Sequence, residues 1–388
     1  MAQPMTTQQL LEIFHRYRND NPVMVSSGRT RAIFRQMGHR DPAMYNTGMS
    51  TTSPACFGLA LARPDLKVIA IEGDGAMLMG LANLATIGRY LPKNLVILVI
   101  NNRTYLSTDR GELESAAAVR ADLRAFARAA GIDRTMVADT LEEFEQIIHQ
   151  AMLEEGPFVI IANVDRTQVP ESPSEKEVPD RAELSIAFRR YLSDIRPSPA
   201  RERKLSSRLD FTEALQSPGQ GREAARIIYN ALKESGIDFF VYLPDSILYP
   251  VQEIAERDPE MMTICCTRED EGVAIASGAT YGGRSPVIVM EGTGLGLSGL
   301  ILAASIVRLI PLLIISSHSE SLGIRAPHND IACMVNEPIL RALNIHYAVL
   351  THLRDASLII RESQRSARVL KNPVAVVVPP YVMDETLS

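Results

Sequence analysis

The sequence has no tryptophan, only four cysteines among 388 residues, and no surplus of positive charge. Its formal net charge of −6 gives no electrostatic basis for binding nucleic acid. No apolar run approaches the roughly 18 residues that a membrane-spanning helix needs, and the first residues lack the basic-then-apolar pattern of a signal peptide. These absences predict a cytoplasmic protein with neither a nucleic-acid partner nor a membrane partner.

The few cysteines also argue against two kinds of site. Cys56, Cys265, Cys266 and Cys333 show no Cys-x-x-Cys spacing, so the sequence indicates neither a zinc site nor a disulfide framework. We expect buried free thiols instead. With 46% hydrophobic and 22% charged residues the composition is that of a globular protein, and the length allows two domains with full cores.

A strand-helix-strand unit is the clearest local pattern. The runs Leu66–Ile71 and Leu95–Ile100 have strand length and β-branched content, and the segment between them has apolar residues at helical spacing. The two strands of such a unit are parallel, so their carboxyl ends lie side by side, where open α/β sheets bind ligands. These ends carry Asp74, between two glycines, and Asn102. Their oxygens suit Mg²⁺ or Ca²⁺, and the glycines would let a phosphate approach a helix N-terminus.

The alternation of strands and helices continues on both sides and predicts a doubly wound α/β domain at residues 1–165. Within it, the polar stretch at 45–50 is predicted as a turn, and residues 103–119 as a loop over the carboxyl edge of the sheet. A single helix is expected between the two strands of the central unit.

Residues 166–220 have prolines scattered among charges, which is typical of a linker, with one possible helix at Ala182–Ile195. The alternation then resumes, and residues 221–388 are predicted to form a second domain of the same architecture. We therefore expect an α/β protein with two doubly wound parallel-sheet domains joined by a long linker.

Two features of the second domain lie at the predicted carboxyl ends of strands. Glu269, Asp270 and Glu271 open a helix, where acidic residues also complement the helix dipole. The glycine turn at 292–296 follows a strand and opens a helix, like a dinucleotide fingerprint. Its glycines are spaced Gly-x-Gly-x-Gly instead of Gly-x-Gly-x-x-Gly, and the next strand ends without an acidic residue, so we expect no NAD binding.

Taken together, these motifs resemble the thiamine diphosphate-dependent 2-oxoacid decarboxylases. That family's diphosphate-binding domain carries Gly-Asp-Gly and, just under thirty residues later, Asn-Asn; this chain has Gly73-Asp74-Gly75 and Asn101-Asn102. Within the family the similarity is greatest to phosphonopyruvate and sulfopyruvate decarboxylases. The similar pieces are Ser27–Arg31, Tyr45–Gly48 and Ile71–Gly75 in the first domain, and Leu243–Leu248, Thr267–Gly272 and Gly294–Gly296 in the second.

The resemblance implies thiamine diphosphate and Mg²⁺ as cofactors. Asp74, the Asn102 side chain and the backbone carbonyl of Thr104 would bind Mg²⁺ together with the diphosphate. Met49 would be the nearest counterpart of the apolar side chain that the family wedges under the bent cofactor. The residues implied to contact the cofactor are Gly48, Met49, Gly73, Gly75, Ala76, Asn102, Gly294 and Leu295.

By the same resemblance, Glu269 would be the carboxylate that hydrogen-bonds the pyrimidine N1′ of the cofactor, with Glu271 as the alternative by register. The chemistry needs such a group because the thiazolium C2–H is a very weak acid, and protonation at N1′ moves the 4′-amino group towards the form that removes this proton. His318 follows a predicted strand end and is a second candidate catalytic residue; a histidine satisfied by loop backbone is the alternative.

A 3-phosphono- or 3-sulfo-pyruvate carries two anionic ends, for which the sequence offers several partners. The turn at Ser27–Arg31 could bind an anion or be a capped helix with solvated arginines, and Asp245-Ser246 could also be a simple helix cap. The candidates are Ser27, Arg29, Arg31, Asp245, Ser246, His318, Arg325 and His328.

The resemblance comes with two departures. In the familiar enzymes the pyrimidine-binding domain comes first or is a separate subunit, whereas here the diphosphate-binding domain would come first. Asn102 is also followed by Arg103, where related enzymes often have glycine. We expect a homodimer or a dimer of dimers with sites at domain interfaces, within or between chains. The predicted reaction is non-oxidative decarboxylation of a 2-oxoacid; a carboligase or lyase, and a non-catalytic cofactor-binding protein, are the alternatives.

Overall fold

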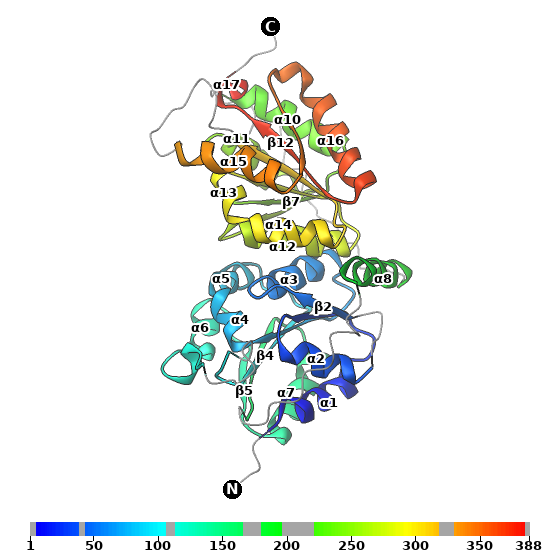
Figure 1. The fold of residues 1–388 in the computed structure, drawn as a ribbon, viewed down its shortest axis with the longest axis vertical. Coiled ribbons are helices and arrows are strands. Elements are labelled where there is room, and N and C mark those ends of the chain that lie inside the picture. The colour runs from blue at the N-terminus through cyan, green and yellow to red at the C-terminus, as the bar shows by residue number, and fades with distance from the viewer. Residues whose placement is uncertain are drawn as a thin grey trace. The chain divides into compact units, whose positions relative to one another are not determined.

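The computed structural model describes residues 5–38, 43–105, 113–165, 180–195, 221–317 and 330–384. It divides the chain into two compact units, Met1–Ala200 and Arg201–Ser388, which we call unit 1 and unit 2 (Figure 1). Within the described ranges, no helix combines the length and apolarity that a membrane span needs.

Unit 1 is built on a six-stranded parallel sheet with the order β2-β1-β3-β4-β6-β5. Its strands are β1 (Val23–Ser26), β2 (Ala43–Thr47), β3 (Val68–Gly73), β4 (Leu95–Asn101), β5 (Thr135–Ala138) and β6 (Phe158–Asn163). Its α-helices are α1 (Thr7–Tyr17), α2 (Arg29–Gln36), α3 (Thr52–Ala62), α4 (Asp74–Met79), α5 (Leu81–Tyr90), α6 (Leu123–Ala129), α7 (Leu141–Leu153) and α8 (Arg181–Asp194).

The centre of this sheet is apolar along its whole length. All seven residues of β4 are buried, as expected for a parallel strand covered by helices on both faces. Helix α3 is made mostly of small residues and is buried on nearly every side. Its start is held by the buried carboxylate of Glu72, which accepts a hydrogen bond from the backbone N–H of Ser53 at 2.7 Å. The turn before α3 is thereby fixed against the end of β3.

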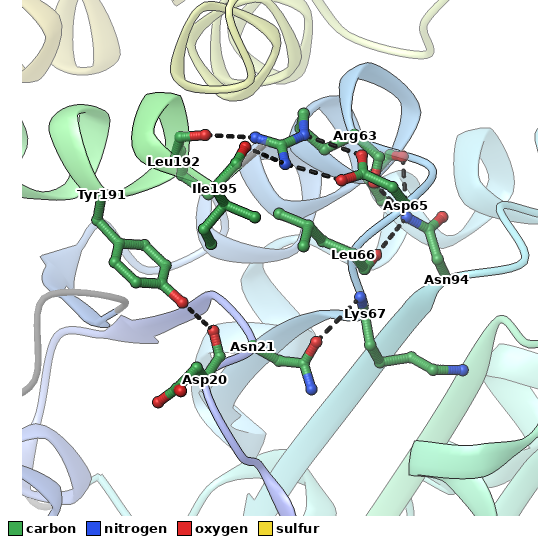
Figure 2. Close-up of polar contacts among 11 residues, drawn as sticks. Asp20, Asn21, Arg63, Asp65, Leu66, Lys67, Asn94, Tyr191, Leu192 and Ile195 are labelled. Carbon is green, nitrogen blue, oxygen red and sulfur yellow. Dashed lines mark hydrogen bonds and ion pairs between the residues drawn. The ribbon is translucent and has the colours of Figure 1, made fainter. Parts of the chain in front are cut away.

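Helix α8 belongs structurally to unit 1, although the sequence placed it in the linker predicted at 166–220. Phe188 and Leu192 are fully buried against the unit. Figure 2 shows how polar contacts hold the end of the helix: Arg63 donates to the carbonyls of Leu192 and Ile195 and pairs with Asp65 at 2.8 Å. The predicted helix at Ala182–Ile195 is present within one residue at each end.

Unit 2 contains a second six-stranded parallel sheet, with the order β11-β12-β10-β9-β7-β8. Its strands are β7 (Phe239–Tyr242), β8 (Met262–Cys265), β9 (Pro286–Met290), β10 (Leu312–Ser317), β11 (His346–Val349) and β12 (Pro373–Val378). Its α-helices are α10 (Arg222–Glu234), α11 (Tyr249–Arg257), α12 (Glu269–Tyr281), α13 (Gly292–Leu297), α14 (Gly299–Val307), α15 (Asp330–Ala342), α16 (Ala356–Leu370) and α17 (Pro380–Met383).

The two sheets have the same topology. Counted in chain order within each unit, and read from the edge nearest the second strand, both run 2-1-3-4-6-5 with all strands parallel. This confirms the predicted fold class of two doubly wound α/β sheets. Each sheet reverses its winding between its first and third strands, and open α/β sheets bind ligands at the carboxyl end of such a switch point.

Several local predictions were wrong. The first half of the stretch predicted as a turn at 45–50 belongs to the edge strand β2, and the edge strand β11 was not predicted. The single helix expected after β3 is two helices, α4 and α5, separated at Gly80. A methyl group at Gly80 would lie 3.1 Å from the Ser50 backbone, so the break lets two segments approach closely.

Candidate active site

The carboxyl ends of β1, β3 and β4 surround a cavity of about 290 Å³ at the switch point of unit 1. Nearly all site residues predicted for this unit line it: Ser27, Arg29, Met49, Gly73, Asp74, Gly75, Ala76, Asn102 and Thr104. Gly48 and Arg31 are the exceptions, because neither is part of the lining. The carbonyl of Gly48 accepts hydrogen bonds from the hydroxyls of Thr51 and Thr52. The structure thus brings together residues that are up to 77 positions apart, from Ser27 to Thr104.

Three of the lining residues, Ser26, Met79 and Tyr105, were not predicted from the sequence. Ser26 ends β1 and Met79 ends α4, and neither stood out from its neighbours in the sequence. Tyr105 follows the predicted metal-binding turn, and its ring lies directly over Gly75. A methyl group on Gly75 would lie 2.6 Å from the Tyr105 ring, which explains why only glycine fits after Asp74.

Among the described residues that line this cavity, Asp74 is the only carboxylate, and it is buried. Burial raises the pKa of Asp74 above its usual value, while hydrogen bonds from the Ser115 hydroxyl and the backbone amides of Gly75 and Asn102 act in the opposite direction. Among the described residues, no group of three or more His, Cys, Asp or Glu could hold a metal ion. A cation bound by Asp74, Asn102 and Thr104 therefore needs anionic oxygens from a ligand as well.

The turn that carries Asn102 forms without glycine. Arg103 adopts a left-handed backbone conformation with φ of +61°, which lets the amide of Thr104 donate to Asn102 Oδ1 at 3.0 Å. Ser50, beside the predicted wedge Met49, adopts a similar φ of +65°. Each of these two turns beside the cavity thus holds a residue in the left-handed conformation, which is unfavourable for residues that carry a side chain.

The cavity fits a diphosphate and a divalent cation. The predicted ligand set supplies hard oxygen atoms, which are the donors that Mg²⁺ takes. The hydroxyls of Ser26 and Thr104 are buried without a hydrogen-bond partner in the structure, so the lining residues still have unsatisfied polar groups. Gly73 leaves the backbone open to close approach by a phosphate, because a methyl group there would meet no atom within 4 Å.

In unit 2 the predicted catalytic residue Glu269 is the first residue of α12 and is half-buried. Gly294, from the glycine turn, packs against it: a methyl group on Gly294 would lie 2.4 Å from Glu269 Cγ. Burial raises the pKa of Glu269, and the nearby negative charges of Asp270 and Glu291 act in the same direction. These surroundings favour the protonated carboxyl, the form that can donate a hydrogen bond.

Glu271, the alternative by register, has a different environment. It is buried, and its Oε2 accepts hydrogen bonds from the backbone N–H and the hydroxyl of Thr267, at 2.9 and 2.7 Å. These contacts close the first turn of α12, which is a local structural role. The geometry therefore supports Glu269 over Glu271.

The other predicted residues of unit 2 do not gather around Glu269 in the same way. Asp245 is buried, with Oδ1 accepting from the amides of Ile247 and Leu248 and Oδ2 from the Ser317 hydroxyl at 2.8 Å. Ser246 is exposed and Leu295 is fully buried in α13. His318, Arg325 and His328 lie outside the described residues.

Comparisons with known proteins agree with this arrangement. Residues 27–162 match the family model described as thiamine pyrophosphate enzyme, C-terminal TPP binding domain. The chain is 33% identical over 159 residues to sulfopyruvate decarboxylase subunit beta from Methanococcus maripaludis, covering 41% of this chain and 83% of that protein. It is 29% identical over 155 residues to subunit alpha from the same organism, covering 39% and 92%.

A further relative is phosphonopyruvate decarboxylase from Streptomyces viridochromogenes, 30% identical over 160 residues, which are 41% of this chain and 39% of that protein. Among solved structures, transketolase from Campylobacter jejuni superposes with a TM-score of 0.61 at 15% identity, covering 98% of this chain and 72% of that chain. At that identity the transketolase shares the fold, and the similarity supports nothing further.

Proposed function

Since the chain belongs to the family of thiamine diphosphate-dependent decarboxylases, we propose that it decarboxylates a 2-oxoacid without oxidation and releases an aldehyde and carbon dioxide. We further propose a substrate with a second anionic group, of the phosphonopyruvate or sulfopyruvate type. The observation that carries the proposal is that Asp74, Asn102 and Thr104 line one cavity at the switch point of unit 1.

Unit 1 would hold the diphosphate end of the cofactor. Asp74, the Asn102 side chain and the Thr104 carbonyl would bind Mg²⁺, and the amides of Gly75 and Ala76 would hold the diphosphate. Because the protein supplies one carboxylate to this set, we expect tight metal binding only in the presence of the diphosphate. Met49 lines the same cavity and is suited to pack against the apolar part of the cofactor.

Unit 2 would hold the pyrimidine end, with Glu269 at N1′ and Gly294 and Leu295 beside it. When bound, thiamine diphosphate supplies a carbon nucleophile and an acceptor for the electrons released with carbon dioxide. The half-buried Glu269 carboxyl would hold a proton at N1′, for which its raised pKa is favourable. The carboxylate of Asp270 adds to this effect from the next position of the helix.

One cofactor molecule must contact both half-sites, from one chain or from two. The sulfopyruvate decarboxylase relatives are named as alpha and beta subunits, and each matches about two fifths of this chain. We propose that this chain combines counterparts of both, with the diphosphate-binding domain at 1–165 before the pyrimidine-binding domain at 221–388. A homodimer or dimer of dimers in the cytoplasm is part of this proposal.

For the substrate, Ser27 and Arg29 are favoured because they line the cofactor cavity. Asp245 is a weaker candidate, since both of its carboxylate oxygens are engaged within unit 2 and its negative charge would repel an anion. Ser246, His318 and His328 stay candidates on the sequence alone.

The test is carbon dioxide release from a panel of 2-oxoacids, including phosphonopyruvate, sulfopyruvate and pyruvate, with added thiamine diphosphate and Mg²⁺. We expect release from one of the two dianionic substrates and at least tenfold less from pyruvate. The Asp74→Ala variant is the matched control, which should show no release. Cofactor binding by the wild-type chain without release from any 2-oxoacid would overturn the proposal.

A further inference from the structure

Ser115 contacts the predicted metal ligand from a segment that no motif identifies. Its hydroxyl donates to Asp74 Oδ2, and the residue is 1% exposed. The two residues are 41 positions apart, and Ser115 lies within the stretch that the sequence predicted as a loop. The contact is therefore made by tertiary structure and is invisible in the local sequence.

Backbone pairing fixes the position of Ser115. The amide of Tyr105 donates to the carbonyl of Leu113 at 2.8 Å, and the amide of Ser115 donates to the carbonyl of Arg103 at 3.0 Å. Thr104 and Glu114 form an antiparallel bridge between these bonds. We call this pairing of residues 103–105 with 113–115 the clip.

The clip acts on the Asp74–Gly75 turn at two points. The Tyr105 ring covers Gly75, and the Ser115 hydroxyl holds the carboxylate of Asp74. The segment of the clip that carries Tyr105 begins directly after Asn102, and the segment paired with it carries Ser115. The clip therefore contacts both side chains of the predicted metal site, Asn102 through the Thr104 amide and Asp74 through Ser115.

We propose that Ser115 is a positioning residue for the metal site. This inference rests on the proposed function. A carboxylate can turn about its Cβ–Cγ bond, and a hydrogen bond to Oδ2 fixes which oxygen is presented to the cation. Partners of this kind orient metal ligands, and losing one typically weakens metal binding by about 10- to 100-fold. The effect should be marked here because, within the part of the chain that the structure describes, Asp74 is the only carboxylate lining the cavity.

The test compares metal binding in full-length variants at saturating thiamine diphosphate, using Mn²⁺ as the probe. The concentration of free Mn²⁺ is measured by electron paramagnetic resonance, and competition with Mg²⁺ gives the affinity for Mg²⁺. For Ser115→Ala we expect metal affinity to fall by about 10- to 100-fold. Ser115→Cys, which keeps a weak donor in a side chain of similar size, should recover part of the loss.

Ser305→Ala is the matched control. Ser305 is also fully buried, and its hydroxyl donates to the carbonyl of Ile301 in its own helix, at 2.9 Å. We expect its metal affinity to stay within twofold of wild type, and each variant is titrated below its own unfolding temperature. A Ser115→Ala affinity within twofold of wild type, or an equal loss in Ser305→Ala, would overturn the inference.

Metal affinity is measured without turnover, so the proposed decarboxylation and the proposed role of Ser115 can be contradicted independently. A wild-type chain that binds Mn²⁺ with the cofactor but releases no carbon dioxide contradicts the proposed function alone. Normal decarboxylation together with undiminished metal binding in Ser115→Ala contradicts the role of Ser115 alone.

Discussion

The two units share one sheet topology, yet equivalent strand ends carry different chemistry. The third strand of unit 1 leads into Gly73-Asp74-Gly75, whereas the third strand of unit 2 leads to Gly292-Thr293-Gly294. A residue flanked by two glycines follows the strand in both units, a buried carboxylate in unit 1 and a threonine in unit 2. The second strand shows the reverse: Glu269 follows it in unit 2, and the apolar Met49 follows it in unit 1. The repeated fold sets where the strand ends lie, and individual side chains determine the chemistry at each of them.

The units also differ in how many predicted residues each gathers. In unit 1 almost all line one cavity, because short loops at adjacent parallel strands bring them together. Among the described residues predicted for unit 2, Glu269 and Gly294 pack against each other, while Asp245 holds its own turn to β10. This difference suggests that unit 1 anchors a ligand and unit 2 supplies a reactive group.

The largest expected effect tests that division of roles. Glu269→Gln removes the ionisable group and keeps the side-chain size, so we expect kcat to fall by roughly 10² to 10⁴-fold. Cofactor and Mg²⁺ affinities, measured by titration calorimetry, should change by less than about fivefold if unit 1 holds the diphosphate as proposed. Glu271→Gln is the control and should keep kcat within about threefold, since an amide oxygen still accepts from Thr267. A collapse of kcat in Glu271→Gln with normal turnover in Glu269→Gln would reverse the assignment.

A second prediction tests whether an active site uses Asp74 and Glu269 from the same chain or from two different chains. Asp74→Ala and Glu269→Gln should each be inactive alone. If a site draws unit 1 from one chain and unit 2 from another, unfolding and refolding the two variants together restores about a quarter of wild-type activity. If each site uses a single chain, no activity returns. The proposed homodimer with shared sites predicts recovery, and its absence assigns both halves to one chain.

The sequence predicts the central strands better than the edge strands. The central strands are long apolar runs, so β3 and β4 were predicted within about two residues at each end. The edge strands β2 and β11 escaped because they are short and carry polar residues such as Thr47 and the exposed His346.

The clustering of the candidate metal and phosphate residues was predictable because their spacing within one strand-helix-strand unit fixes their geometry. Ser115 and Tyr105 were not, since they reach the Asp74–Gly75 turn through pairing across a loop. Sequence also could not separate Glu269 from Glu271, because the distinction rests on which carboxylate closes the first turn of α12.

The third prediction concerns Asp245, whose role separates scaffolding from substrate binding in unit 2. Removing its carboxylate in Asp245→Ala leaves the Ser317 hydroxyl and two amides without their acceptor, so unfolding free energy should fall by about 1 to 3 kcal/mol. Urea denaturation measures this loss. The KM of the enzyme should stay within about twofold of wild type if Asp245 is a scaffold residue, and a tenfold rise would restore it as a substrate-binding residue.

The pH dependence of stability gives a further check on the same residue. Burial raises the pKa of Asp245 in the folded state, so the stabilisation it contributes is present below the unfolded pKa and is lost as pH rises through the folded pKa. Asp245→Asn does not titrate and keeps an oxygen acceptor. The stability of wild type relative to Asp245→Asn should therefore decrease as the pH rises above the ordinary pKa of an aspartate, following the titration of this carboxyl. A difference that stays constant or grows with pH would contradict the burial argument.

The smallest expected effect concerns the turn that gives unit 1 its second metal ligand. Arg103 is exposed and has φ of +61°, a conformation that disfavours side chains by about 1 to 2 kcal/mol and that glycine adopts freely. Glycine also raises the entropy of the unfolded chain, which offsets about 0.5 to 1 kcal/mol of the gain. We expect Arg103→Gly to stabilise the protein by about 0.5 kcal/mol in urea denaturation, the difference between these two terms.

The control is Arg226→Gly, which replaces an exposed arginine inside α10. It should destabilise the protein by about 1 kcal/mol, because a helical residue has no left-handed strain that glycine could remove. Equal losses in both variants would mean that the left-handed turn stores no strain, and that Asn102 is held by the clip and the Thr104 amide alone.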